Sequence, residues 1–148
     1  MNKNSYSMVE GILKGYPKLK VEIDNLKLDL EEVNEVVGIS GDSGNERAGS
    51  STNAFSSVVE NEVLEREKNL KRKIKELTNL IQRKERQLKK IENILGMLTE
   101  YEMQLIEMRY FKRYSVGRIC DILELTEDGF NKKRKRLIRE ILIPLFVL

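Results

Sequence analysis

Hydrophobic residues recur in alternating steps of four and three positions along two long stretches of the chain. In the first stretch these positions are Leu19, Ile23, Leu26, Leu30, Val33 and Val37. In the second they are Val63, Leu70, Ile74, Leu77, Ile81, Leu88, Ile91, Leu95 and Leu98. A seven-residue repeat with two apolar positions is typical of helices that pair along one face. The pattern predicts two long helices, the second about 60 Å long at 1.5 Å per residue.

Local signals set the expected ends of these helices. Residues 1–15 favour a short amphipathic helix that is interrupted before Pro17, a residue suited to the first turn of the next helix. Residues 38–57 are rich in glycine and serine, which predicts a flexible loop. Ser57 and Glu60 form an S-x-x-E capping box at the expected start of the second long helix. The loop is long enough for the two helices to form an antiparallel hairpin.

The shorter predicted helix covers only about half of the longer one. The rest of the apolar stripe needs another partner, so we expect a homodimer or a higher homo-oligomer. The alternative is that the stripe packs on the C-terminal part of the same chain. Glu67 and Lys84 occupy core positions of the repeat, where they would weaken or specify the pairing.

Basic residues line the second helix, namely Lys71, Arg72, Lys73, Lys75, Arg83, Lys84, Arg86, Lys89 and Lys90. They could follow a DNA backbone, which attracts lysine and arginine. The glutamates interspersed among them favour a solvated coiled-coil surface instead.

Residues 98–142 carry three shorter helical patterns. The first begins at a T-x-x-E capping box formed by Thr99, and a polar break at residues 112–114 ends it. Ser115 and Thr126 can cap the second and third helices. Two short helices joined by a tight turn, the second of them basic, have the layout of a helix-turn-helix DNA-binding motif.

The third helical pattern separates into an apolar and a polar face. Its apolar face, which can pack on the first two helices, consists of Phe130, Leu137, Ile138 and Ile141. The polar face and the two caps supply the candidate DNA-contacting residues, which are Ser115, Thr126, Glu127, Asp128, Asn131, Lys132, Lys133, Lys135, Arg136 and Arg139. Residues near the start of a recognition helix reach base edges, and cations further along meet phosphates. The alternative is a merely solvated face; the capped turn before it favours DNA binding.

These residues resemble region 4 of bacterial sigma-70 factors. The matching residues are Leu98-Thr99-Glu100, Leu105-Ile106, Arg109-Tyr110, Ser115, Ile119, Ile122-Leu123 and Leu125-Thr126. Over the whole chain, the layout is similar to the phage late-gene transcriptional regulators of the ArpU and RinA type. The resemblance implies binding to double-stranded DNA, activation of phage or prophage late genes in a bacterial host cell, and contact with RNA polymerase.

Two positions depart from the sigma-like pattern. Glu124 stands in the turn where glycine is common, and a left-handed backbone there would cost roughly 1 kcal/mol. Gly129 lies inside the third helix, where it either weakens the helix by about 1 kcal/mol or allows close approach to DNA. The acidic pair Glu127 and Asp128 either accepts hydrogen bonds from cytosine or complements the helix dipole.

Composition narrows the classes of function. The chain has one cysteine and no histidine, which excludes a histidine-based triad and the usual zinc sites. Cys120 is expected to be a core thiol. Without a glycine-rich phosphate loop or other catalytic constellation, we expect no enzyme, no catalytic residue, no cofactor and no metal. No stretch approaches the roughly 18 apolar residues of a membrane span, and no signal peptide is evident, so we expect a cytoplasmic protein.

The sequence thus predicts an all-α protein with two regions. Residues 1–98 form an antiparallel helical hairpin or coiled coil, and residues 99–148 form the helix-turn-helix module. The apolar end from Ile143 to Leu148 packs on the module or a second subunit, with Pro144 ending the helix. Two other functions fit this layout: a phage DNA-packaging protein of the small-terminase type, which the order of the helices disfavours, and a coiled-coil adaptor that does not bind DNA.

Overall fold

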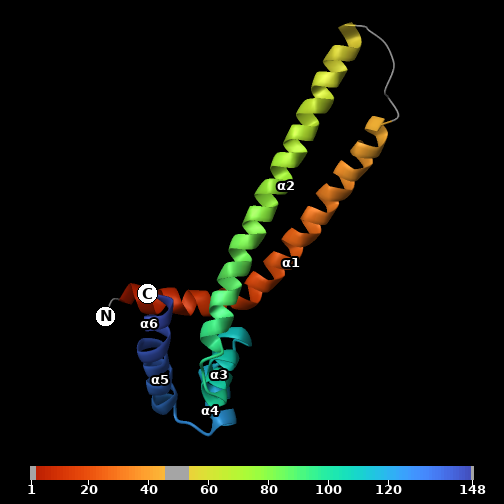
Figure 1. Cartoon of the computed structure of the whole chain (residues 1–148). Helices are drawn as coiled ribbons and strands as arrows, with labels where there is room; N and C mark the ends of the chain where they lie inside the picture. Colours follow the sequence, from red (N-terminus) through yellow and green to blue (C-terminus); the bar gives the residue numbers. More distant parts are fainter. Residues whose placement is uncertain (1–2, 46–53, 148) are drawn as a thin grey trace. The chain divides into compact units, whose positions relative to one another are not determined.

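The computed structural model describes residues 3–45 and 54–147, with side chains from 3 to 38 and from 58 to 147. All regular structure in these ranges is helical (Figure 1), which confirms the predicted all-α fold. The elements are α1 (Lys3–Asn45), α2 (Ala54–Leu95), α3 (Glu100–Ile106), η1 (Glu107–Phe111), α4 (Val116–Leu123), α5 (Glu127–Arg136), η2 (Leu137–Leu142) and α6 (Ile143–Phe146). The segments η1 and η2 are π-helical turns that continue α3 and α5.

The chain divides into two compact units. Unit 1 consists of residues 1–21 and 86–148, and unit 2 of residues 22–85. This division differs from the predicted boundary between residues 98 and 99. The reason is that the first turns of α1 and the last turns of α2 contribute buried side chains to the same core as the helix-turn-helix.

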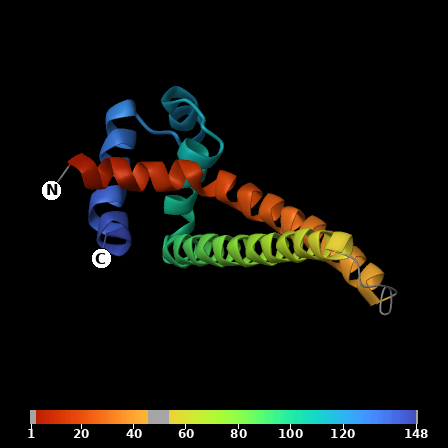
Figure 2. The same ribbon diagram turned by 90° about the horizontal axis from the view of Figure 1, so that it is seen from above.

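The core of unit 1 joins residues that lie far apart in the sequence. Val9 and Leu13 of α1 are fully buried together with Ile106, Phe130 and other side chains of the C-terminal helices. Figure 2 shows the first turns of α1, in red, lying across these helices, in cyan to blue. The buried C-terminal positions include Phe130, Leu137 and Ile138, as the periodicity predicted, and Cys120 is buried as expected.

Pro17 lies inside α1, so the predicted interruption before it is wrong. A proline within a helix leaves one backbone carbonyl without its usual donor and costs about 3 kcal/mol. Leu13 before it is fully buried in the unit 1 core, and Leu19 after it packs against the same core. Burial of apolar side chains on both sides of Pro17 offsets this cost.

The C-terminal end also continues through a proline. Pro144 occupies the first turn of α6, and the helix runs on to Phe146, so the prediction that Pro144 ends the helix is wrong. A proline is tolerated in a first turn, where the helix leaves backbone N–H groups unpaired in any case. Ile143 is buried and Phe146 packs against the core, so the apolar end does pack on the module, as predicted.

In unit 2 the two long helices pack as an antiparallel pair. Ile23 and Val33 of α1 and Ile81 of α2 are buried between them. Lys84, at a core position of the repeat, places its Nζ 2.9 Å from a Glu22 carboxylate oxygen, and Lys27 pairs with Glu85 at the same distance. The predicted hairpin is confirmed, and the Lys84–Glu22 pair favours this alignment of the two helices.

The long helices extend further than predicted. α1 continues to Asn45 and α2 begins at Ala54, so the predicted loop is wrong for residues 38–45 and 54–57, and its remainder lies outside the described residues. Ser57 is within α2 rather than before it. Each residue added to an existing helix closes another backbone hydrogen bond, so a helix can run past its last packed position.

Candidate nucleic-acid interface

Short polar side chains begin the helices of the helix-turn-helix. The Ser115 hydroxyl oxygen accepts a hydrogen bond from the Arg118 N–H at 3.2 Å, and Thr126 Oγ1 accepts one from the Gly129 N–H at 3.0 Å. The capping box at Thr99 is also formed. The three caps predicted for these helices are therefore confirmed, which fixes the start of α3, α4 and α5 to a single residue, whereas the capping box predicted at Ser57 is wrong because Ser57 lies inside α2.

The turn between α4 and α5 adopts the left-handed backbone conformation at Glu124, the position where the sigma-like pattern commonly has glycine. Glu124 has φ 56° and ψ 48°. The next N–H group, that of Leu125, donates to the Cys120 carbonyl at 3.0 Å, which is the long hydrogen bond of a Schellman motif. A glutamate therefore occupies a backbone position that glycine would fill without strain.

Replacing Glu124 with glycine is expected to raise the free energy of unfolding by about 1 kcal/mol, because the left-handed strain disappears. Asp121→Gly is the matched control, since it removes an exposed acidic side chain from the interior of α4. That control should lower stability by up to about 1 kcal/mol. Urea denaturation followed by circular dichroism measures both. A similar loss in both variants would show that Glu124 stabilises the turn through its side chain.

Gly129 has a local reason to be glycine. A Cβ atom built on it would lie 3.0 Å from Thr126 Oγ1, the oxygen that caps α5. A larger residue would push the cap outwards by a few tenths of an ångström. The cap itself therefore accounts for glycine at this position.

One side of α5 is exposed and strongly basic. The exposed candidates on this helix and its continuation are Glu127, Asp128, Lys132, Lys133, Lys135, Arg136 and Arg139, while Asn131 is half-buried. Phe130 on the other side is fully buried. At about 100° per residue, the face directly opposite the core carries Asp128, Lys132, Lys135 and Arg136. Arg139 lies in η2, and its guanidinium carbon is 5.9 Å from the centre of the ring of Tyr6, which packs against the core. Three cations and one carboxylate thus face away from the core.

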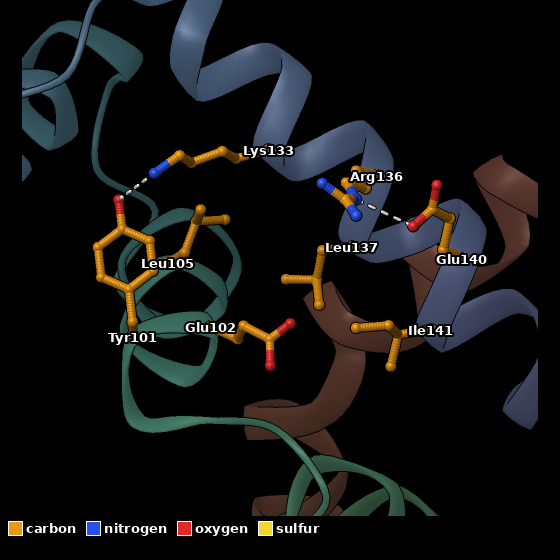
Figure 3. Close-up of a pocket in the computed structure, with 8 residues that line it drawn as sticks. All are labelled: Tyr101, Glu102, Leu105, Lys133, Arg136, Leu137, Glu140 and Ile141. Carbon is orange, nitrogen blue, oxygen red and sulfur yellow. Dashed lines mark hydrogen bonds and ion pairs between the residues drawn. The ribbon is translucent and has the colours of Figure 1, made fainter.

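Lys133 and Arg136 hold intramolecular contacts beside a surface pocket (Figure 3). Lys133 Nζ lies 3.4 Å from the Tyr101 hydroxyl and 4.8 Å from the centre of its ring. Arg136 Nε lies 3.0 Å from a Glu140 carboxylate oxygen in a well-exposed pair. The pocket, of about 340 Å³, has apolar side chains in its lining, Leu105, Leu137 and Ile141. Because exposed pairs contribute little stability, both cations can exchange these partners for phosphates at small cost.

Arg134 differs from its basic neighbours. Its guanidinium carbon lies 5.6 Å from the centre of the Phe130 ring, and its Nε is buried without a hydrogen-bond partner among the described residues. Burial raises the pKa of the nearby Tyr6 phenol, and the Arg134 charge opposes that shift. The run from Lys132 to Arg136 is therefore not a uniform solvated surface. Helical periodicity places Arg134 on the same side of the helix as Phe130.

The sequence interpretation overlooked a second group of exposed cations, Lys112, Arg113 and Arg118, around the start of α4. The Arg118 guanidinium carbon lies 3.8 Å from the centre of the Tyr114 ring, and Arg113 has φ 56°. In the sequence, the feature that could have identified this group is the presence of cations on both sides of Ser115. Helix N-termini and flanking cations are common phosphate contacts in DNA-binding proteins.

Residues 7–142 match the family described as "Protein of unknown function (DUF722)". The chain belongs to this family. The match includes the helix-turn-helix and most of both long helices. No curated protein and no solved structure matches the chain.

In this DUF722 protein, the first turns of α1 are tied to the module by a buried tyrosine. The Tyr110 hydroxyl donates to a Glu10 carboxylate oxygen at 2.8 Å. Burial raises the pKa of the Tyr110 phenol far above its usual value of 10.0, and the hydrogen bond to Glu10 adds to the shift. The folded protein therefore holds the Tyr110 proton at a pH where the unfolded chain releases it.

Above pH 10, this difference is expected to make stability fall. The unfolded chain then binds fewer protons than the folded protein, so Tyr110 alone lowers the free energy of unfolding by up to about 1.4 kcal/mol per pH unit. Tyr110→Phe should cost about 1.5 kcal/mol at neutral pH, through the lost hydrogen bond, and should remove this slope. The stability difference between the two proteins, measured by urea denaturation, should shrink above pH 10. A constant difference would mean that Tyr110 ionises normally when folded.

Two further features bear on the class of site. Among residues 3–45 and 54–147, no group of three or more histidine, cysteine, aspartate or glutamate residues could hold a metal ion. Within the same residues, no helix combines the length and apolar character needed to cross a membrane.

Proposed function

We propose that this protein is a sequence-specific DNA-binding transcription regulator that uses α5 as its recognition helix. The observation that carries the proposal is the exposed face of α5, with Lys132, Lys135 and Arg136 on a helix whose start is fixed by the Thr126 cap, and with the exposed Arg139 in its continuation η2. A helix of this kind can enter the major groove, where its first turns contact bases and its later cations contact phosphates. Asp128 is placed to accept a hydrogen bond from cytosine.

The resemblance to sigma-70 region 4 and to phage late-gene regulators extends this proposal. It supports the activation of phage or prophage late genes, with RNA polymerase as a protein partner. The cations around the start of α4, which include Arg118, add a phosphate contact beside the recognition helix.

We also propose that the chain self-associates through its long helices. In unit 2, α2 leaves four large apolar side chains exposed, namely Val58, Val59, Val63 and Leu64, with exposed fractions between 41% and 59%. Contact between copies would remove this surface from water. A two-fold dimer would also present two recognition helices to a two-part DNA site.

Light scattering at micromolar concentration is expected to give the mass of a dimer or a larger oligomer. Val59→Lys/Val63→Lys should shift the particle towards the monomer, because the apolar contact would be replaced by like charges. The matched control, Asn61→Lys/Asn69→Lys, adds the same charge at exposed polar positions of the same helix and should leave the mass unchanged. A monomeric wild-type particle would contradict self-association.

Binding of the full-length protein to duplex DNA at two salt concentrations tests the proposed function. Fluorescence anisotropy with a labelled duplex of about 30 base pairs should show binding that weakens steeply between about 50 and about 200 mM salt. Absent or salt-insensitive binding would favour a coiled-coil adaptor. Ring-shaped assemblies of many subunits that bind DNA would favour a packaging protein.

A further inference from the structure

In unit 2, α2 carries a basic face directed away from α1. Five exposed cations make up this face, and they are Lys68, Lys71, Arg72, Lys75 and Arg83. At about 100° per residue they occupy one half of the helix surface. The opposite half carries Leu70, Ile74, Leu77 and Ile81, which are buried or half-buried against α1. None of the five cations forms an ion pair with another described residue.

The glutamates of the same stretch are mostly elsewhere on the helix. Glu85 pairs with Lys27 of α1 at 2.9 Å, and Glu67 is half-buried beside the apolar stripe. Glu76 borders the basic face, and Glu65 lies three residues before its first cation, Lys68. Positive and negative charges that alternate along the sequence therefore lie mostly on different sides of the helix. In the sequence, the glutamates among these cations favour a merely solvated surface. In the structure, they do not neutralise this face.

This arrangement works against the stability of the helix. Lys68 and Arg72, and likewise Lys71 and Lys75, are like charges four residues apart, and such pairs repel. A surface that served only solubility would intersperse the two signs. An anionic partner would turn the repulsion into attraction.

We propose that the basic face of α2 is a second DNA-contacting surface, which binds the phosphate backbone of a duplex without reading its sequence. From Lys68 to Arg83 the face extends about 23 Å along the helix. That length exceeds the roughly 12 Å width of the major groove, so the helix can reach phosphates on both of its sides. The proposal rests on DNA binding by this chain and assigns to unit 2 a sequence-independent share of the affinity.

Two other anionic surfaces fit less well. A helix that lies on a membrane inserts an apolar face, but the apolar residues alongside these five cations, Leu70, Ile74, Leu77 and Ile81, are buried or half-buried against α1. A second copy could offer the acidic outer side of its α1, which carries Asp24, Glu32 and Glu35. That contact would join two different surfaces, which builds a ring or an open chain of copies rather than a two-fold dimer.

The test compares two double variants of the full-length chain that remove the same charges. Arg72→Gln/Lys75→Gln changes the basic face, whereas Arg66→Gln/Lys73→Gln removes one exposed arginine and one exposed lysine from other sides of the same helix. Glutamine is a good helix former, so the helix content measured by circular dichroism should be unchanged in both. Affinity for a duplex of about 30 base pairs is measured by anisotropy at several salt concentrations.

The basic-face variant should bind about tenfold more weakly at low salt, and the slope of log affinity against log salt should fall by about 2, since each phosphate contact contributes about 0.9. The preference for a selected sequence over a scrambled one should be unchanged, because this face reads no bases. The control variant should behave like wild type. Equal behaviour of the two variants, either both unchanged or both weakened, would overturn the proposal.

The remaining outcomes separate this surface from the recognition helix. If neutralising α5 has no effect while the basic-face variant lowers the salt slope, the recognition-helix proposal fails and this one stands. If only α5 substitutions weaken binding, this one fails alone. If the basic-face variant keeps its DNA affinity but loses binding to phosphatidylserine vesicles, the face serves a membrane. If it keeps its DNA affinity but no longer forms larger particles at low salt, the face serves a second copy. Either result overturns the proposal.

Discussion

Leu13→Ala is expected to lower the free energy of unfolding by about 3 kcal/mol, although Leu13 lies more than a hundred residues before α5 in the sequence. Leu13 is fully buried in the core that also contains Phe130 and Ile138. Removing three of its side-chain carbons would leave a cavity beneath the helix-turn-helix, and such cavities cost both transfer and packing energy. A loss of this size is a large part of the stability of a small domain.

Met8→Ala is the matched control for this prediction. Met8 is on the same helix but is 44% exposed, so its truncation should cost well under 1 kcal/mol. Guanidinium unfolding followed by circular dichroism compares the two variants. A similar small loss in both would contradict the conclusion that the first turns of α1 belong to the core of the helix-turn-helix module.

Neutralising the exposed face of α5 is expected to have the second large effect. Lys132→Ala/Lys135→Ala/Arg139→Ala should weaken binding to duplex DNA by roughly a hundredfold and should lower the salt slope by nearly 3, since each lost phosphate contact removes about 0.9. All three side chains are exposed, and Lys132 and Lys135 lie opposite the buried Phe130, while the Arg139 guanidinium carbon lies 5.9 Å from the centre of the Tyr6 ring. Their removal should therefore leave the fold intact, which circular dichroism and thermal unfolding would verify.

The matched control removes three cations from the same unit on another helix. Lys3→Ala/Lys14→Ala/Lys18→Ala gives the same net charge, and all three residues are exposed on the first turns of α1. If net charge alone drove binding, both triple variants would lose affinity equally. Selective loss in the α5 variant would assign the contacts to the recognition helix.

The helix-turn-helix could be predicted almost residue by residue because its signals are local. Thr99, Ser115 and Thr126 cap helices at the expected positions. The buried and exposed sides of α5 follow from a period of about 3.6 residues. The resemblance to the sigma-like pattern also located the strained turn at Glu124, because that pattern commonly has glycine at the residue before the cap, and Glu124 adopts the left-handed conformation there.

The composition of the core could not be predicted in the same way. The hydrogen bond between Tyr110 and Glu10 joins residues 100 positions apart, and no sequence pattern marks such a pair. The same tertiary packing explains why α1 continues through Pro17, where a local rule predicted a break. Intrinsic preferences decide helix ends only where burial does not compete with them.

The central claim is that α5 reads DNA sequence, and selection from a pool of randomised duplexes tests it most directly. The full-length protein should enrich duplexes that share a common sequence over successive rounds. The Lys132→Ala/Lys135→Ala/Arg139→Ala variant should bind every pool more weakly. Asn131→Ala, at a half-buried position near the start of the helix, should relax the preference at one base pair by about 1 to 3 kcal/mol. Failure of the wild-type protein to enrich any sequence, or enrichment that is the same in all three proteins, would contradict the claim.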